Sequence, residues 1–259
     1  MIGKSSNTNP SNATKPARRR RGIYLLPNLF TSAALFSGFY AITSAINGRY
    51  ELAAIVLFAA MVLDSLDGRV ARLTNTQSEF GAQYDSLADM ISFGAAPALV
   101  IFTWSLSSFG KLGWFAAFVY AATCALRLAR FNTQLGSADR RYFQGLPSPA
   151  AAAILAGYVW LCIEYEQSGA FVHYAAIALT VFAGLLMVSN IRYYSFKDID
   201  FHGKVPFVVT IGVMLSFAVI FTHPPIMLFG IAICYAISGP LMTLLMLRRH
   251  RDKRKSGEG

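Results

Sequence analysis

The chain has 259 residues, of which 55% are hydrophobic and 14% are charged, and its formal net charge is +10. This composition is too apolar for an ordinary soluble globular domain. The basic residues gather at the edges of apolar segments and no nucleic-acid-binding motif accompanies them, so a nucleic-acid partner is not expected. The composition predicts an integral membrane protein whose basic residues set its orientation and attract anionic lipid headgroups.

Eight apolar segments follow one another along the chain, each about the 20 residues that a helix needs to cross a membrane. Residues 1–22 are predicted to form a disordered basic tail, residues 23–247 a membrane-embedded domain, and residues 248–259 a basic C-terminal tail. No segment alternates with period two, so a β-barrel is excluded and an all-α, polytopic helical bundle is predicted. The segments are expected at Tyr24–Ile46, Glu51–Arg72, Tyr84–Leu106, Trp114–Phe131, Ser148–Tyr165, Ala170–Asn190, Pro206–Phe221 and Ile226–Leu247.

Lysine and arginine are distributed unequally between the two sets of connections. With eight spans, 21 of them fall on the side that holds both termini, and the other side holds only Arg49 and Lys111. Because cytoplasmic loops are enriched in Lys and Arg, both termini are predicted to be cytoplasmic.

Four aspartates are flanked by apolar runs such as AAIVLFAAMVL and MISFGAAPALVIF: Asp64, Asp67, Asp85 and Asp89. One Asp at the centre of a membrane helix costs about 2.5 to 3.5 kcal/mol, so a partner that offsets the charge is expected. Members of the first pair are three positions apart and those of the second pair four apart, so each pair lies on one face of its helix. A polar run near Thr76 separates the pairs and predicts two antiparallel helices that bring all four carboxylates into one acidic cage.

Such a cage calls for cations, because neighbouring carboxylates repel one another unless positive charge compensates them. Oxygen-only ligands in this number suit Mg²⁺, Mn²⁺ or Ca²⁺, and two ions would stabilise the attacking and leaving oxygens of a phosphoryl displacement. Gly68, Ala71 and Gly81 would let a ligand approach the backbone. Arg72 can pair with a phosphate oxygen. The pattern predicts a hard-metal site that binds a nucleotide diphosphate.

Residues 64–89 read DSLDGRVARLTNTQSEFGAQYDSLAD and resemble the CDP-alcohol phosphotransferase family, whose pattern DxxDGxxARx8GxxxDxxxD they match at all eight fixed positions. The resemblance implies that Asp64, Asp67 and Asp85 ligate metal, and that Asp89 binds the second metal or takes the proton from the acceptor hydroxyl. It also implies two Mg²⁺ or Mn²⁺ ions, a homodimer, and contacts between the CDP moiety and four residues: Gly68, Ala71, Arg72 and Gly81.

Within that family, four segments resemble the bacterial integral-membrane members that transfer a phosphatidyl group from CDP-diacylglycerol to L-serine, in phospholipid biosynthesis. They are PNLFTSAALFSGF at 27–39, SLADMISFGAAPA at 86–98, ALRLARFN at 125–132 and FQGLPSPAAA at 143–152. This resemblance implies an enzyme of the cell (inner) membrane, and the distribution of Lys and Arg predicts that its active site is on the cytoplasmic side. Family members that use glycerol phosphate, inositol phosphate or choline would keep the four aspartates, so the serine acceptor rests on these segments.

Several further assignments remain open between two interpretations. Asn28 and Thr31 are candidates for contact with the cytidine or the diphosphate, or for ordinary helix capping. Arg127 and Arg130 are candidates for binding the lipid phosphate or the serine carboxylate, or for anchoring the helix at the membrane edge. A cation transporter can also carry intramembrane carboxylates, but it would not require the neighbouring glycines or an arginine directed at a phosphate, and no internal repeat accompanies them.

Overall fold

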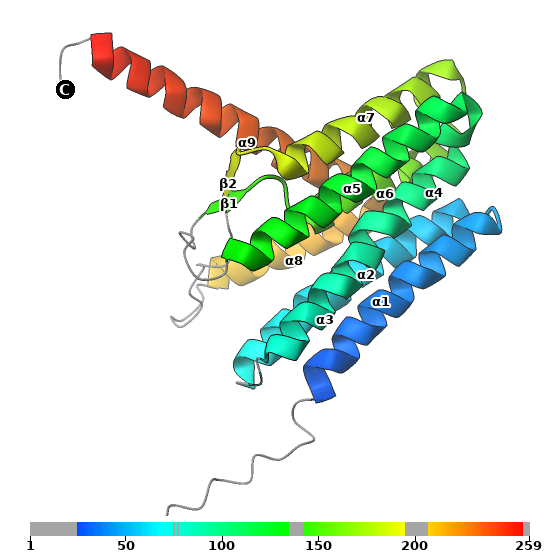
Figure 1. Cartoon of the computed structure of the whole chain (residues 1–259), viewed down its shortest axis with the longest axis horizontal. Helices are drawn as coiled ribbons and strands as arrows, with labels where there is room; N and C mark the ends of the chain where they lie inside the picture. Colours follow the sequence, from blue (N-terminus) through cyan, green and yellow to red (C-terminus); the bar gives the residue numbers. More distant parts are fainter. Residues whose placement is uncertain (1–24, 75, 77, 135–141, 195–206, 256–259) are drawn as a thin grey trace, which may run out of the picture.

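A computed structural model of the chain describes residues 25–74, 76, 78–134, 142–194 and 207–255. The predicted tail at residues 1–22 lies outside these residues. The described chain forms a bundle of long helices (Figure 1). Its helices are α1 Leu25–Ile46, α2 Tyr50–Leu73, α3 Glu79–Asp89, α4 Ala96–Trp104, α5 Lys111–Gln134, α6 Ser148–Glu164, α7 Ala170–Val188, α8 Phe207–Thr222 and α9 Pro224–Lys255.

All eight predicted segments are helical, which confirms the all-α bundle. The third segment is divided: α3 continues through a π-helical turn, Met90–Ala95, into α4, and together they form one span from Glu79 to Trp104. The last helix, α9, continues to Lys255, past the expected boundary at Leu247, and projects from the bundle in Figure 1.

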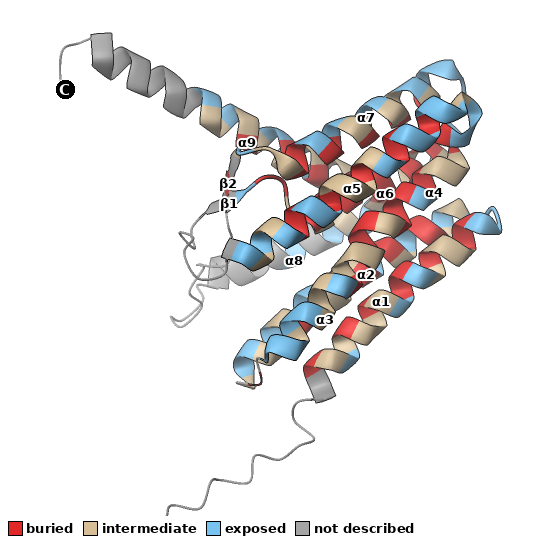
Figure 2. Ribbon diagram, in the orientation of Figure 1, coloured by how far each residue is buried: buried red, intermediate tan, exposed pale blue. Residues whose placement is uncertain are grey.

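The surface of the bundle is suited to a lipid environment. Within the described residues, five helical segments are long and apolar enough to cross a membrane: Pro27–Ile46, Glu79–Trp104, Lys111–Thr133, Ala170–Val188 and Pro224–Leu244. Exposed residues follow the outer faces of the helices in Figure 2, and large apolar side chains such as Phe36, Trp114 and Phe171 are among them. The chain is therefore a multi-pass membrane protein.

Small residues allow the helices of the bundle to approach one another closely. α1 packs along α2, α5 along α7, and α6 contacts both α2 and α9. Alanines of α1 and α2 are almost completely buried, including Ala41 and Ala45 of α1 and Ala53 and Ala54 of α2. Small side chains are typical of contacts between membrane helices, which depend on close packing because lipid is as apolar as a helix surface.

A short antiparallel ribbon, which the sequence did not predict, lies at one end of the bundle. Strand β1, Tyr142–Gln144, pairs with β2, Arg192–Tyr194, with Phe143 opposite Tyr193. Each strand has only three residues, so the fold remains helical.

Tyr193 fastens this ribbon to α9. Its buried hydroxyl donates to the Ala236 carbonyl at 3.0 Å. Pro240 lies inside α9 four residues further on and has no N–H, so the Ala236 carbonyl lacks its usual helical partner. Gly239 provides the space, since a Cβ there would lie 2.5 Å from the Tyr193 ring. The ribbon thus compensates for a proline within a membrane helix.

Candidate active site

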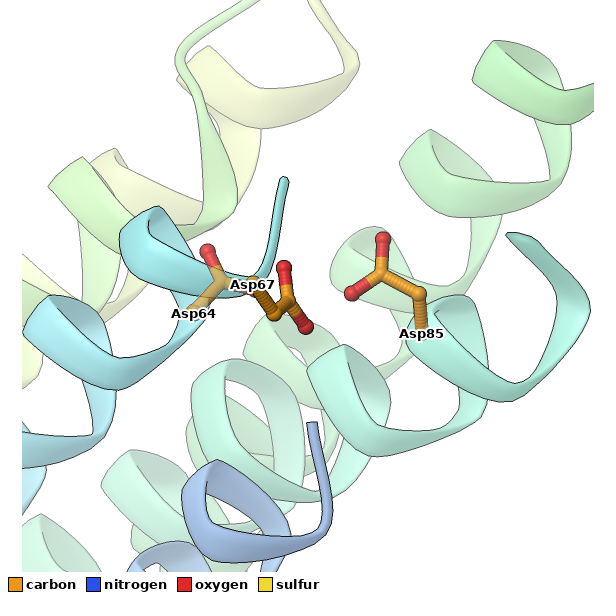
Figure 3. A group of neighbouring side chains, drawn as sticks. All are labelled: Asp64, Asp67 and Asp85. Atoms are coloured by element: carbon orange, nitrogen blue, oxygen red, sulfur yellow. The ribbon is translucent and has the colours of Figure 1, made fainter. Parts of the chain in front are cut away.

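The acidic cage forms where α2 and α3 meet. α2 ends at Leu73, and α3 begins after Ser78, whose side chain caps it by accepting the Gly81 N–H at 3.0 Å. The helices carry one aspartate pair each, as the spacing predicted. One carboxylate oxygen from each of Asp64, Asp67 and Asp85 lies within 4.8 Å of the other two. Figure 3 shows Asp85 across a short gap from the two α2 aspartates, with its carboxylate turned toward them.

Asp89 adjoins this group. It is the last residue of α3, and its side chain is within hydrogen-bonding reach of Asp64. Asp64 and Asp85 both repel its negative charge, whereas the Arg127 guanidinium attracts it. The four carboxylates therefore lie together, with Asp64, Asp67 and Asp85 forming the tight group and Asp89 adjoining it through Asp64.

The donor set fits a hard divalent cation. Two carboxylates in hydrogen-bonding reach of one another cannot both remain ionised without a compensating proton or cation, and this arrangement occurs twice, between Asp64 and Asp89 and between Asp67 and Asp85. All the donors are oxygens, and no His or Cys joins the three-residue group among the described residues. Oxygen donors of this kind suit Mg²⁺, Mn²⁺ or Ca²⁺ and not the thiol- or imidazole-preferring metals.

Thr31 of α1 holds one of these carboxylates. Its buried hydroxyl lies 2.6 Å from Asp67 Oδ2 and 3.1 Å from the Pro27 carbonyl, to either of which it can donate. Asp67 is also buried. A substrate contact was one sequence interpretation of Thr31 and remains a prediction, but the geometry gives the hydroxyl a clear partner in the cage.

If Asp67 ligates metal as the sequence predicts, we expect Thr31→Val to lower kcat by about tenfold and to raise the Mn²⁺ concentration needed for activity, because partners that orient metal-ligating carboxylates typically affect metal affinity 10- to 100-fold. The valine keeps the shape and removes only the hydroxyl. Turnover measured against Mn²⁺ concentration tests this. Thr103→Val is the matched control, since among the described residues the Thr103 hydroxyl bonds only carbonyls of its own helix, Leu99 and Val100. An unchanged Mn²⁺ dependence in Thr31→Val would contradict a role of Thr31 in orienting Asp67.

The small residues expected to contact the nucleotide flank the cage on both helices. On α2, a Cβ at Gly68 would lie 3.6 Å from Arg72 Nη1, so the exposed Arg72 side chain lies beside this glycine. Arg72 also attracts the Asp67 carboxylate. On α3, a Cβ at Gly81 would lie 3.7 Å from Asn28 Oδ1, which brings α1 into the same region. Ala71 lies in α2 between Gly68 and the end of the helix and is partly exposed.

Comparison with known proteins identifies the family of the chain. The profile of the CDP-alcohol phosphatidyltransferase family matches residues 24–186, which include the whole cage. The chain belongs to this family. It is 40% identical over 195 residues to the CDP-diacylglycerol–serine O-phosphatidyltransferase of Helicobacter pylori, covering 75% of this chain and 82% of that protein.

Two further relatives have a similar sequence identity to this chain. The CDP-diacylglycerol–serine O-phosphatidyltransferase of Methanocaldococcus jannaschii is 35% identical over 71% of this chain and 80% of its own length. The archaetidylserine synthase of Methanothermobacter thermautotrophicus is 36% identical over 65% of this chain and 69% of its own length. The CDP-alcohol phosphatidyltransferase family generally depends on a divalent metal, in agreement with the aspartate cluster.

Arg127 of α5 lies near the acidic cage, inside the bundle. It is only 9% exposed, and its Nη1 donates to Ser148 Oγ at 3.1 Å, at the first residue of α6. Its Nε has no hydrogen-bond partner among the described residues. A buried guanidinium with a spare donor, next to a helix N-terminus and attracted to Asp89, is a site that favours a further anion.

Arg130 has a different environment, which the sequence did not reveal. Its Nη1 donates to the Val188 carbonyl at 3.1 Å and its Nη2 to the Gln144 carbonyl at 3.1 Å. Further carbonyl contacts reach Met187 and Ser189. Arg130 therefore caps the last turn of α7, whose carbonyls have no partner within the helix, and joins it to β1. A direct contact between Arg130 and substrate remains a prediction.

Proposed function

We propose that this chain transfers the phosphatidyl group of CDP-diacylglycerol to L-serine and releases CMP, in phospholipid biosynthesis. The observation that carries the transfer chemistry is the carboxylate cluster on α2 and α3, which lies inside the segment matched by the family. The acceptor is supported by the relatives, whose names all specify serine although their lipid groups differ between phosphatidyl and archaetidyl.

In the proposed reaction, the serine hydroxyl oxygen attacks the phosphorus of the phosphatidyl phosphate. A new phosphorus–oxygen bond forms, the bond to the CMP oxygen breaks, and the hydroxyl proton passes to a carboxylate oxygen of Asp89. Asp64, Asp67 and Asp85 would hold the divalent cations, with Asp89 either adjoining them or contributing to the second. Two Mg²⁺ or Mn²⁺ ions at this position would neutralise the charge that develops on the diphosphate.

The donor, CDP-diacylglycerol, is proposed to bind beside the carboxylates of α2 and α3. Gly68, Ala71 and Gly81 leave backbone accessible beside the carboxylates, and Arg72 offers a paired set of N–H donors to a phosphate. Asn28 lies next to Gly81 and would contact the same CDP moiety. The lipid tails of the donor would remain in the membrane beside the bundle.

The acceptor is proposed to bind on the Arg127 side of Asp89. Serine carries a carboxylate, and the buried Arg127 guanidinium with its spare Nε supplies the matching charge. Arg127 also attracts Asp89, so a carboxylate bound there would place the serine hydroxyl close to the proposed base. Arg130 would contribute to this site indirectly, by holding the last turn of α7 that it caps.

The remaining proposals concern the whole protein. We propose an inner-membrane enzyme, with both termini and the site on the cytoplasmic side, because the lysine and arginine distribution favours this orientation. The domain boundaries at residues 23 and 247 and a homodimer are proposed from the sequence and the family resemblance.

The acceptor assay tests this function directly. Detergent-solubilised protein is supplied with CDP-diacylglycerol, Mn²⁺ or Mg²⁺, and one acceptor at a time, and CMP release is measured. We expect turnover with L-serine and at least about 100-fold less with ethanolamine, which lacks the carboxylate, because a site built for a charged partner rejects an analogue without it. Turnover with glycerol phosphate, inositol phosphate or choline and none with serine would reject the serine acceptor.

A further inference from the structure

The π-helical turn in the third span begins directly after Asp89. It comprises Met90–Ala95, and the Ala96 N–H that closes it bonds to the Ile91 carbonyl, five residues back. A regular α-helix rotates by about 100° per residue, so the extra residue in this turn changes the direction of everything before it relative to everything after it by about that angle. The segment that follows is fixed, because Val100 and Ile101 of α4 are buried in the core. The direction of Asp85 and Asp89 therefore depends on this turn.

A buried tyrosine of α5 stabilises the turn. Tyr120 is completely buried, and its hydroxyl donates to the Phe93 carbonyl at 3.0 Å. Pro97 follows Phe93 by four residues and has no N–H, so this carbonyl has no partner from the usual helical pattern. The same arrangement joins Tyr193 to the carbonyl that Pro240 leaves open in α9. At Phe93, however, the carbonyl lies four residues from Asp89.

α1 holds the turn from the other side. Ser92 Oγ donates to the Ala34 carbonyl at 3.0 Å, and Ser92 is buried. Gly38 faces the same residue, and a Cβ there would lie 2.7 Å from Ser92 Cα. The wide turn thus packs closely against α1 at Gly38, which has no side chain.

One face of α5 lies along the third span, beside the π-helical turn and Asp89. Tyr120 contacts the Phe93 carbonyl, Cys124 lies opposite Gly94, where a Cβ would be 3.2 Å from its sulfur, and Arg127 attracts Asp89. These residues are spaced four and three apart and share a helix face. α5 therefore contacts the turn through Tyr120 and also carries Arg127, which attracts the Asp89 carboxylate just before the turn.

We propose that the Met90–Ala95 turn, fixed by Tyr120 and Ser92, sets the direction of the Asp89 carboxylate, and that Tyr120 is a positioning residue for the transfer reaction. The inference rests on the proposed function, in which Asp89 receives the acceptor proton. Tyr120 itself does not touch the substrate; it acts through the Phe93 carbonyl.

The test compares Tyr120→Phe with Tyr158→Phe. Each variant removes one hydroxyl from a buried ring that donates to a backbone carbonyl, and the Tyr158 hydroxyl bonds Val172 at 2.9 Å. Tyr158 packs against Trp104 and Phe229, away from the carboxylates. We expect Tyr120→Phe to lower kcat by about 10- to 100-fold with little change in the KM for CDP-diacylglycerol, since a small misplacement of a reacting group has effects of this size. Tyr158→Phe is expected to stay within about twofold of the parent kcat, although the melting temperatures of both variants fall.

Turnover is measured with whichever acceptor gives CMP release, and Mn²⁺ affinity is measured on the same samples by electron paramagnetic resonance. A kcat loss of about fivefold or more that is specific to Tyr120→Phe supports the inference, and a smaller loss, or equal losses in both variants, overturns it. If no acceptor gives CMP, the proposed function fails, and the inference is then decided by Mn²⁺ affinity. A weakening of about threefold or more in Tyr120→Phe alone would support it, whereas equal affinities would overturn it.

Discussion

Asp89→Asn is expected to lose CMP release almost completely, with kcat falling by about 10²- to 10⁴-fold, the usual contribution of a positioned acid or base. The amide has nearly the same shape as the carboxylate but cannot accept the serine proton. The fold should tolerate the change, because Asp64 and Asp85 repel the native charge and Asn removes that repulsion. The variant is therefore expected to be expressed and folded but inactive.

CMP release at saturating CDP-diacylglycerol and serine measures this effect. Glu164→Gln provides the matched change of a carboxylate to an amide at an exposed site, the last residue of α6, and should leave kcat within about twofold of the parent. Turnover near the parent level in Asp89→Asn would remove this residue as the base.

Metal affinity then distinguishes a base from a ligand. Asp64, Asp67 and Asp85 approach one another within 4.8 Å, whereas Asp89 adjoins them through Asp64. This geometry predicts that Asp89→Asn weakens Mn²⁺ binding less than Asp67→Asn does. The opposite order would assign Asp89 to the metal ligands.

The sequence revealed those parts of the site that depend on local spacing. Asp64 and Asp67 share a face of α2, and Asp85 and Asp89 share a face of α3, because residues three and four apart always do so in a helix. The polar run around Thr76 marked the turn that returns the chain. Together these features were enough to predict that four carboxylates meet.

Contacts between residues distant in the chain could not be predicted in this way. Thr31 and Asp67 are 36 positions apart, and Asn132 donates to Ser86 across 46 positions at 3.1 Å. Nothing in the sequence around Thr31 or Asn132 specifies the partner of its side chain, because that partner depends on how α1 and α5 pack. The same holds for the π-helical turn: the third segment was predicted as one helix, and its wide turn contacts Gly38 of α1 and Tyr120 of α5.

Removal of divalent metal is expected to stop the reaction and to be reversible. Carboxylates grouped as Asp64, Asp67 and Asp85 are, with Asp89 adjoining them, bind protons or cations in place of one another, so chelation should leave the cage protonated or distorted and without the charge that the diphosphate requires. We expect EDTA treatment to lower CMP release by at least about 10³-fold, and added Mn²⁺ or Mg²⁺ to restore it, since a metal can contribute several kcal/mol to the stabilisation of transition-state charge.

Two controls separate metal loss from other effects of the chelator and of mutation. EDTA saturated with Mg²⁺ before addition has no free capacity and should leave turnover unchanged. Asp67→Asn should reproduce the effect of chelation in the presence of metal, whereas Glu51→Gln, an exposed carboxylate in the first turn of the same helix, should not. Full turnover after chelation, with residual metal shown to be absent by elemental analysis, would contradict a metal role for the cage. The carboxylates would then have to be kept together by shared protons and by Arg72 and Arg127, which attract Asp67 and Asp89.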